Sequence, residues 1–421
     1  MNEGTLRHGG ARRRGNHATG SPTGCGPLLP APRDERPIKL RLLEWLRAAG
    51  TASRVDMARE LGVSPGSITT ASADLIELGL IEERASTRDP TRGRPPVDLT
   101  LTPDAAAVVG IKLSDDFHTA VILNFAGQML GEAALATNAH LQSVDTVFKE
   151  IETLIGYALA AARLKAEKLV GVGLGLPGIV AHESGRAMWS PLLVEQALDL
   201  GPMLAERISL PVSVDNDANL LTLAELWFGA GRTMSDFVVV TVEHGVGMGL
   251  VIENRLIHGA GGFGMELGHT KVALDGALCR CGQRGCLEAY VADYALVREA
   301  RTALGAPRDS TESPRALLQR LLAEAQRGHP AARSIFRRAS RHLALGLSNV
   351  VQLFDPSLII LSGGQVRFDM LYSEEVIEEM KGLTLNTGQT PRVEVSARGD
   401  MVWARGAAAM ALSEYTSRVV K

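Results

Sequence analysis

The chain has 421 residues, of which 45% are hydrophobic and 22% charged, with a formal net charge of −3. This is an ordinary composition for a soluble globular protein, and the length allows two or three domains. No apolar run reaches the roughly 18–20 residues of a membrane span, and no apolar segment follows the early basic stretch as in a secretory signal. We therefore expect a cytoplasmic protein without a membrane partner.

Charge is unevenly distributed along the chain. Lys and Arg outnumber Asp and Glu over the first 100 residues, whereas acidic residues are in excess over the rest. This asymmetry is compatible with a nucleic-acid-facing front end, and equally with a solvated basic tail. Residues 1–35 are rich in Gly, Pro, Arg and Ser without periodicity, so we predict a disordered basic tail that includes Cys25.

Residues 36–101 have the pattern of a winged helix-turn-helix DNA-binding domain. The segment "IKLRLLEWLRAAG" predicts a helix that stops at Gly50. Two further helices are predicted, beginning at the cap residues Ser53 and Ser64 and joined by a turn at Gly62. The strands flanking the basic turn "TRGRPP" then predict the wing. The alternative is a packed helix pair without a DNA-binding role, which this basic turn argues against.

The recognition helix is expected to present small polar side chains to the major groove, namely Ser67, Thr69 and Thr70. Residues 64–78 contain no Lys or Arg. Contacts to DNA phosphates must therefore come from elsewhere, and we assign them to the arginines of the wing, with helix or tail arginines as further sources. The wing arginines are Arg88, Arg92 and Arg94, and the helix arginines are Arg54 and Arg59.

Residues 102–421 alternate between strands and longer helices, which is typical of α/β folds. The segments "AAAVVGIKL", "TAVILNF" and "QMLGEAALA" predict successive strands, and "DFVVVTVEHGVGMGLVIENRLIHGA" repeats the strand–turn–strand opening. This approximate duplication predicts two similar lobes that face one cleft. A late strand, "SLIILSGG", ends in paired glycines, where such folds tend to bind ligands.

The stretch "LCRCGQRGCLEAY" contains three of the four cysteines of the chain. Cys279, Cys281 and Cys286 have the spacing C-x-C-x4-C, and glycines punctuate the loop, as in structural zinc sites. His269 is the nearest histidine on the N-terminal side. The alternative is three buried cysteines without a metal.

The extended segment "GFGMELGHTKVALDGALCRCGQRGCLEAY" resembles the signature of the ROK family (repressor, open reading frame, kinase). The resemblance covers roughly residues 36–415 and implies a two-lobed, actin-like sugar-kinase fold, of duplicated ribonuclease-H-like lobes, behind the winged helix-turn-helix domain. It also implies a structural Zn²⁺ and a sugar site. The implied zinc ligands are His269, Cys279, Cys281 and Cys286, and the implied sugar-binding residues are Asn216, Asp217, Glu266, His269 and Glu288.

The alternatives for these polar residues are structural. Without the motif, Glu266 and Glu288 would be ordinary surface carboxylates. In the kinases of the family, the residue that matches Asp217 is the general base. Asn216 and Asp217 also suit an Asx cap of the following helix, and the cap is compatible with sugar binding.

The expected ATP site departs from the family pattern. Kinases of the family carry a D-x-G-G-T hairpin, whose glycines and main-chain N–H groups hold the phosphates. Here Leu113-Ser114-Asp115 replace Gly-Gly-Thr, Asp116 follows, and the second phosphate hairpin begins with Glu243-His244. Carboxylates at this position would repel ATP, so we expect no catalytic residue and no kinase activity, with Asp217 a degenerate base.

The sequence thus predicts a sugar-responsive transcriptional regulator of carbohydrate metabolism genes, most simply a repressor. The expected partners are a palindromic operator, a small sugar effector and a second copy of the chain, in a homodimer or homotetramer. The alternative is an active ATP-dependent sugar kinase with an added DNA-binding domain, and control by a protein partner is a third option.

Overall fold

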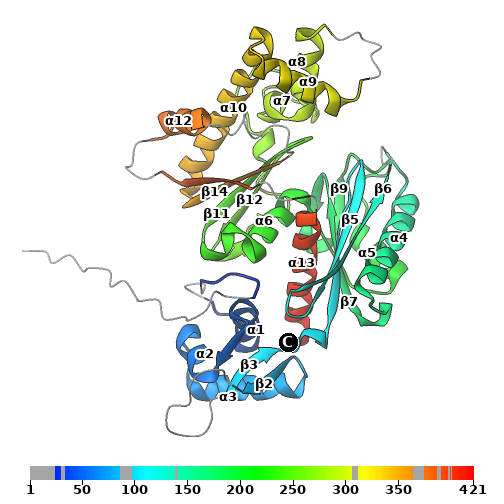
Figure 1. Ribbon diagram of the computed structural model, residues 1–421, viewed down its shortest axis with the longest axis vertical. Helices are drawn as coiled ribbons and strands as arrows, with labels where there is room; N and C mark the ends of the chain where they lie inside the picture. Colours follow the sequence, from blue (N-terminus) through cyan, green and yellow to red (C-terminus); the bar gives the residue numbers. More distant parts are fainter. Residues whose placement is uncertain are drawn as a thin grey trace, which may run out of the picture.

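The computed structural model describes residues 24–29, 34–85, 97–137, 141–305, 312–363, 374–385, 390–396, 399 and 401–421. A small helical domain lies at one end of the molecule, and two α/β lobes rise from it side by side (Figure 1). Among the described residues, no helix is both long and apolar enough to cross a membrane.

The small domain is a winged helix, as predicted. Its helices are α1 (Ile38–Ala49), α2 (Arg54–Leu61) and α3 (Pro65–Glu77), and its sheet has the order β1 (Thr51–Ser53), β3 (Val97–Leu101), β2 (Ile81–Ala85). Strands β2 and β3 pair antiparallel as expected for a wing, whereas the short β1 was not predicted. Residues 86–96 lie outside the described residues.

Local capping explains where the two short helices begin. The Ser53 hydroxyl accepts the Asp56 N–H at 3.2 Å, and the Ser64 hydroxyl accepts the Ser67 N–H at 3.1 Å. Gly62 separates the helices in a left-handed conformation, with φ 65°, which costs a glycine little. The two serine caps and the glycine turn are local features of the sequence, and they determine where the helices of the helix-turn-helix begin and end.

The first lobe is built on a five-stranded sheet of order β10-β7-β4-β5-β6. Helices α4 (Val144–Ala162) and α5 (Leu200–Ile208) cover its outer face, and a hairpin of β8 (Ile179–Ala181) and β9 (Arg186–Trp189) lies beside β10. The strands are β4 (Ala107–Lys112), β5 (Phe117–Asn124), β6 (Met129–Ala136), β7 (Leu169–Leu176) and β10 (Val212–Asn216).

The second lobe repeats this arrangement with the order β13-β12-β11-β14-β15. In both sheets the first three strands form an antiparallel meander, the fourth strand pairs parallel to the first, and the fifth pairs parallel to the fourth. The predicted duplication and the actin-like two-lobed fold are therefore confirmed. The strands are β11 (Phe237–Val242), β12 (Val246–Ile252), β13 (Arg255–Leu256), β14 (Leu358–Gly363) and β15 (Arg392–Ser396).

The second lobe also carries helices over one face of its sheet (Figure 1). Their apolar sides pack into a single core with the strands. They are α7 (Glu288–Val291), α8 (Asp293–Ala303), α9 (Pro314–Gln326), α10 (Pro330–Phe354) and α12 (Glu374–Leu383).

Two helices join the lobes. Helix α6 (Asp217–Phe228) leaves the first sheet and packs on β12, while the C-terminal helix α13 (Met401–Val419) returns to lie between the first sheet and α6. The approach of α13 to the sheet is close: a Cβ on Gly110 would lie 2.1 Å from the Ala404 carbonyl oxygen, and one on Gly173 would lie 1.9 Å from that of Ala407. Glycine at these positions is a packing requirement.

The prediction of disorder over residues 1–35 is wrong for residues 24–29, which form a strap between the winged helix and the lobes. Cys25 is 5% exposed, its N–H donates to the Arg47 carbonyl at 3.0 Å, and its thiol donates to the Ala126 carbonyl at 3.5 Å. Gly26 N–H donates to the Trp227 carbonyl at 2.8 Å. The composition of the tail hid these contacts because they are made mostly by the backbone.

Arg47 of α1 is the centre of this junction. It is 2% exposed, its guanidinium lies over the rings of Phe125 and Trp227, and it donates to the Thr416 hydroxyl at 3.0 Å. One side chain of the winged helix thus contacts the first lobe, α6 and α13, and a continuous apolar core runs through all of them.

Candidate functional site

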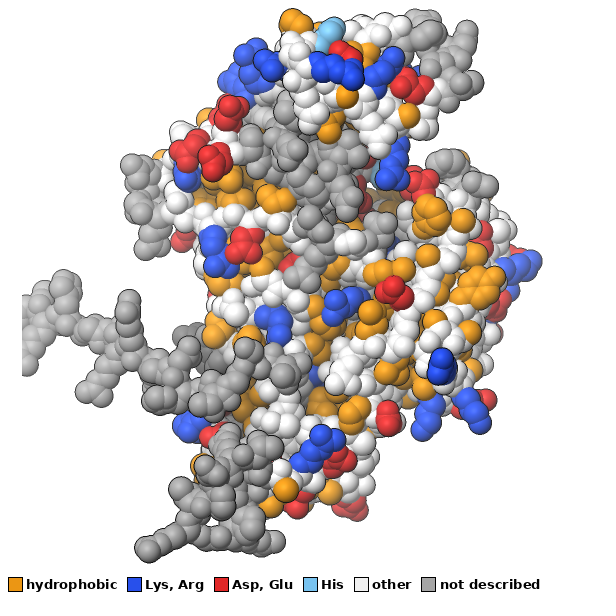
Figure 2. Space-filling model, in the orientation of Figure 1, with side chains coloured by type: hydrophobic (Ala, Val, Ile, Leu, Met, Phe, Trp, Pro, Cys, Tyr) orange, Lys and Arg blue, Asp and Glu red, His pale blue; other side chains and the backbone are white. Residues whose placement is uncertain are grey.

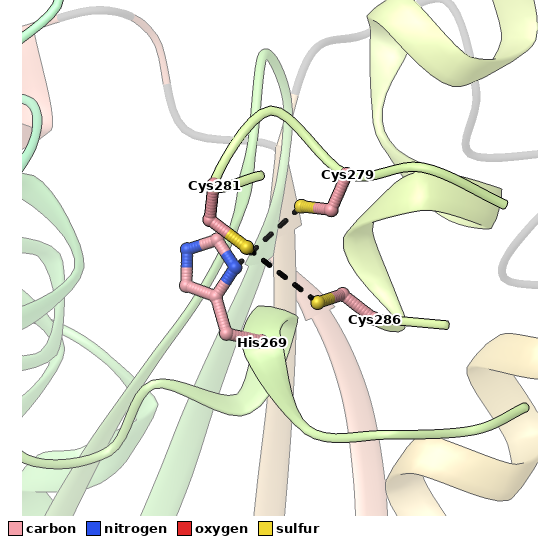
Figure 3. A group of neighbouring side chains, drawn as sticks. All are labelled: His269, Cys279, Cys281 and Cys286. Atoms are coloured by element: carbon pink, nitrogen blue, oxygen red, sulfur yellow. Dashed lines mark hydrogen bonds between the residues drawn. The ribbon is translucent and has the colours of Figure 1, made fainter. Parts of the chain in front are cut away.

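The predicted metal ligands come together in one group (Figure 3). One donor atom from each of His269, Cys279, Cys281 and Cys286 lies within 4.8 Å of all the others. The Cys281 and Cys286 sulfurs are 3.7 Å apart, and the Cys279 sulfur is 3.7 Å from Nδ1 of His269. A tetrahedral ion bound at ~2.3 Å from two sulfurs separates them by about 3.8 Å. The donor set and its spacing fit Zn²⁺.

Polar neighbours support this group from outside. Lys271 donates to the Cys286 sulfur at 3.0 Å, and Tyr294 donates to the Cys279 sulfur at 3.5 Å. Three thiolates and Zn²⁺ together carry one negative charge, which the Lys271 ammonium offsets. Outer partners of this kind orient metal ligands.

Glycines shape the cysteine loop. Gly282 and Gly285 have φ of +84° and +76°, and a Cβ on Gly285 would lie 1.6 Å from the Ala273 carbonyl oxygen. The loop can therefore turn back on itself only with glycine at residue 285, and this turn brings Cys286 under Cys281.

His269 faces two directions. Its Nδ1 points to the cysteines, while its Nε2 lies 4.0 Å from the Glu266 carboxylate. Both residues belong to the segment around a short 3-10 turn, Leu267–His269. One imidazole can thus bind a metal through one nitrogen and donate to a ligand through the other, provided that the metal fixes the tautomer.

Three carboxylates gather beside this histidine. Burial, followed by the charges of Asp217 and Glu288, raises the pKa of Glu266 to about 7. Burial also raises the pKa of Asp217, against the charge of Lys112. Glu288 accepts the Val246 N–H at 3.2 Å. Carboxylates crowded in this way are costly unless hydroxyl groups or a cation share them, which is what a polyol ligand supplies.

Asn216 and Asp217 stand where β10 ends and α6 begins. The Asn216 side chain accepts the Asn219 N–H at 2.8 Å, so it is the N-cap of α6, as the structural alternative predicted. The Asp217 carboxylate accepts its neighbour's N–H at 2.9 Å. Asp217 and Glu266 therefore come close enough from different lobes for their charges to interact, because Asp217 follows the first sheet and Glu266 follows the meander of the second.

The two hairpins expected at a phosphate site contact each other. Asp115, between β4 and β5, lies 3.4 Å from Nε2 of His244, between β11 and β12. At the second hairpin, a Cβ on Gly245 would lie 2.9 Å from the Glu288 carboxylate. The surviving glycine therefore has a steric reason that does not involve a phosphate.

The predicted DNA-contacting residues lie on α3 or outside the described residues. Thr69 and Thr70 are exposed on α3, whereas Ser67 is half-buried and shares a hydrogen bond with the Ser64 hydroxyl at 2.8 Å. Arg88, Arg92 and Arg94 fall outside the described residues. Ala73 is also exposed on α3, one turn after Thr69 and Thr70, and so lies on the face that is expected to contact DNA. The sequence prediction did not include Ala73, and only the helical period could have indicated it.

The helix arginines named as further phosphate contacts are engaged within the domain. Arg54 pairs with Glu83 at 2.7 Å, and Arg59 pairs with Asp56 at 3.1 Å. On the face seen in Figure 2, the described residues carry acidic and basic side chains side by side. No single-sign field is therefore visible on that face over the described part of the chain.

Sequence reasoning also missed a polar cluster behind Asn216. Asp215, His182 and His258 lie together there, and the Asp215 side chain is 1% exposed. A carboxylate inside the apolar strand "LPVSVDND" was the signal that could have found it, because a buried charge needs partners.

The fold and site together define a two-lobed, sugar-kinase-like protein with a winged helix at its front. The chain belongs to the ROK family, whose model matches residues 108–414.

Named relatives agree with this assignment. A xylose repressor from Caldicellulosiruptor bescii is 27% identical over 385 residues, which are 90% of this chain and 96% of the relative. A crystal structure of a ROK family transcriptional regulator, a homologue of the E. coli MLC protein, superposes with a TM-score of 0.75 at 26% identity, over 91% of this chain and 97% of that one.

A kinase of the family matches a smaller part of the chain. The ROK hexokinase from Thermus thermophilus has a TM-score of 0.62 at 29% identity and covers 73% of this chain, although 99% of its own is matched. The regulator's greater coverage of this chain, against the hexokinase's, is consistent with the winged helix as an addition to the kinase-like body.

Proposed function

We propose that this protein is a DNA-binding transcriptional repressor of carbohydrate metabolism genes whose operator affinity is set by a sugar. One observation carries the proposal: a winged helix shares a continuous core with a two-lobed ROK body, in which carboxylates and a His-Cys₃ group converge. The name of the C. bescii relative supports a pentose as a first candidate effector. The protein would act in the cytoplasm.

Sugar binding in this proposal uses Asn216, Asp217, Glu266, His269 and Glu288. A sugar donates several hydroxyl protons at fixed angles, and carboxylates accept such bonds strongly. When bound, Zn²⁺ supplies a rigid anchor for the loop. His269, Cys279, Cys281 and Cys286 would hold it, and His269 would then donate to the sugar through Nε2.

The degenerate hairpins support a role without catalysis. Asp115 and Asp116 place negative charge where a phosphoryl donor would sit, and Asp115 contacts His244 instead. Asp217 retains a partly buried position and a raised pKa, yet a base does nothing without a donor. The second candidate remains an ATP-dependent sugar kinase, and the kinase-like body favours testing it.

Linkage dictates how the sugar can act. A sugar that needs both lobes shifts the protein toward the closed arrangement, and it changes operator affinity only if that arrangement holds the winged helix differently. Arg47 contacts the first lobe, α6 and α13, which gives a physical route for this coupling. We propose a homodimer or homotetramer on a palindromic operator, since paired half-sites need paired winged helices.

Thermal shift of the purified protein against a panel of pentoses and hexoses is the first test. A sugar that binds only the folded state raises the melting temperature. Duplexes selected from a random pool then serve in gel shifts with and without that sugar, and the proposal expects weaker binding with it. Turnover in a coupled assay with ATP and any sugar of the panel would establish the kinase instead.

The wing gives a sharper test of DNA binding. We expect Arg94→Ala to weaken binding to the selected duplex several-fold. The slope of affinity against salt concentration should fall by the amount that corresponds to about one phosphate contact. Thr70→Ala, on the exposed face of α3, should instead change the preferred sequence with the salt slope preserved. Unchanged affinity and slope for the Arg94 variant would place the phosphate contacts outside the wing.

A further inference from the structure

A cluster of His182, Asp215 and His258 joins the two lobes behind the proposed sugar site. Asp215 lies in β10 of the first lobe, His182 in the turn between β8 and β9, and His258 just after β13 of the second lobe. One carboxylate oxygen of Asp215 is 2.7 Å from Nε2 of His258 and 3.2 Å from Nδ1 of His182. A single buried oxygen thus contacts a histidine from each lobe, and Nδ1 of His182 also lies 3.3 Å from the Val214 carbonyl oxygen.

The other oxygen of Asp215 holds the sugar-site backbone. It accepts the Asn216 N–H at 2.7 Å and the Asn219 side-chain N–H at 2.8 Å. Asn219 is also the residue whose N–H the Asn216 side chain caps. The position of Asn216, and of Asp217 after it, therefore depends on Asp215.

His258 begins the loop that leads to Glu266. The loop closes on itself, because Gly264 N–H donates to the His258 carbonyl at 2.9 Å. The loop also packs against the first lobe. Gly262 has φ +77°, and a Cβ there would lie 3.1 Å from the backbone nitrogen of His182. The His258 contact thus fixes the loop that delivers Glu266 and His269.

We propose that His182, Asp215 and His258 form an interlobe clasp, a set of positioning residues that holds the two halves of the sugar site at their binding separation. The clasp rests on the proposed sugar binding, since its role is to bring Asn216 and Asp217 to Glu266. The contact between the lobes is stronger when the imidazole pair carries one more proton than two neutral rings do.

Ring geometry decides between a proton and a metal. The two imidazoles stack at 4.1 Å with an interplanar angle of 8°. The lone pairs of stacked rings lie in parallel planes, so both nitrogens meet a shared partner off their axes, which a hydrogen bond to one oxygen tolerates better than metal coordination does. Each ring can instead donate one N–H to the shared oxygen. Two protonated rings at this separation would repel each other, so the stack favours one charge.

The charged surroundings set the direction of the pH effect. Burial opposes the charge on His182, but Asp215, the Val214 carbonyl and the more distant Glu414 of α13 outweigh it and raise the pKa of His182. Burial opposes ionisation of Asp215, but the two imidazoles outweigh it and hold the pKa of Asp215 at about 2, so the carboxylate stays ionised. A raised histidine pKa contributes stability fully below the unfolded value of about 6.5 and loses it as pH rises through the folded value.

Matched variants separate donation from protonation. His182→Asn and His258→Gln keep an N–H donor near Nδ1 and Nε2, respectively, but cannot take up a proton. We expect wild-type sugar affinity to fall about fivefold between about pH 6 and about pH 8.5, as a charged hydrogen bond becomes neutral. Glu266, with a pKa of about 7, adds the same pH dependence to every protein, so the two variants should lose only the fivefold component relative to the wild type, and His258→Ala should bind weakly at both pH values.

A second measurement works without a sugar. The melting temperature of the wild type should fall relative to His182→Asn over the same pH interval, and the contributions of groups that both proteins share cancel in this comparison. Equal pH slopes in wild type and variants would overturn the clasp. The clasp would also be overturned if the wild type bound a second equivalent of zinc and His182→Asn and His258→Gln did not.

Failure of the sugar proposal looks different. If no sugar shifts the wild type at any pH, the sugar site is in doubt. The difference in melting temperature between wild type and His182→Asn would still report the interlobe contact itself.

Discussion

Individual side chains in the cysteine loop have separable roles. Cys279 and Cys286 are buried, whereas Cys281 is exposed. Replacing a buried cysteine disturbs packing as well as metal binding, so its effect on a ligand would be ambiguous. Cys281 reaches the group from the solvent side, so replacing it tests metal binding with little effect on packing.

We expect Cys281→Ser to lose the bound zinc and, with it, the sugar-induced thermal shift. Without the metal, only the contact with the Cys279 sulfur remains at His269 Nδ1, and Nε2 loses its fixed direction toward the sugar. Metal analysis and thermal shift on the same sample measure both effects. Gln283→Ala, an exposed non-ligand in the same loop, is the control. A sugar response that survives in zinc-free protein would reduce the loop to a structural staple.

The His-Cys₃ group and the carboxylates beside it were predictable from sequence because a long, specific motif carries them. Asp215, His182 and His258 were not, because they are far apart in sequence and only the facing of the two lobes brings them together. Cys25 was misplaced for a related reason. Its partners Arg47 and Ala126 come from other elements, and a Gly- and Pro-rich context says nothing about them.

At the scale of elements, the contact of α13 with the first sheet sets the geometry of the hinge. Gly110 and Gly173 let the helix backbone touch the strands. The sequence indicated the strands and the duplication through their repeated patterns, but the apolar residues of the last helix do not gather on one side. Periodicity could not show that it crosses back to the first lobe.

We expect Gly110→Ala to destabilise the protein by more than about 4 kcal/mol or to prevent folding, because its methyl group would overlap helix backbone. Gly156→Ala in α4 is the matched control. It lies in an exposed helix interior with nothing within 4 Å of a new Cβ, so a gain of about 0.5–1 kcal/mol is expected. Urea unfolding midpoints compare the two, and equal midpoints would contradict the packing of α13.

The whole molecule behaves as one body because its core does not stop at the winged helix. Leu42, Leu43 and Leu46 of α1 belong to the same apolar cluster as Trp227 of α6 and Trp403 of α13. The sequence suggested a separate front domain, since composition and pattern change near residue 102. The packing across that boundary arises only in the tertiary structure, so the sequence pattern did not indicate it.

Arg47→Ala is expected to split the unfolding of the protein into two transitions. The change removes two ring contacts and two hydrogen bonds at a buried site, at a cost of roughly 2–4 kcal/mol. Calorimetry should show one transition for the wild type and an earlier one for the winged helix in the variant. Arg59→Ala, which loses only exposed ion pairs, should keep a single transition. Two transitions in the wild type would refute the shared core.

The strap and Arg47 also constrain the order in which the chain can assemble during synthesis. Gly26 meets a side chain 206 residues further on, and Arg47 meets Thr416 after 369 residues. At ribosomal rates, Thr416 follows Arg47 by roughly 20 to 70 s. The winged helix can fold early on its own capping signals, but for that time its inner face has no partner. A nascent chain would thus carry a DNA reader that is formed but not yet governed by the sugar site, until the last helix leaves the ribosome.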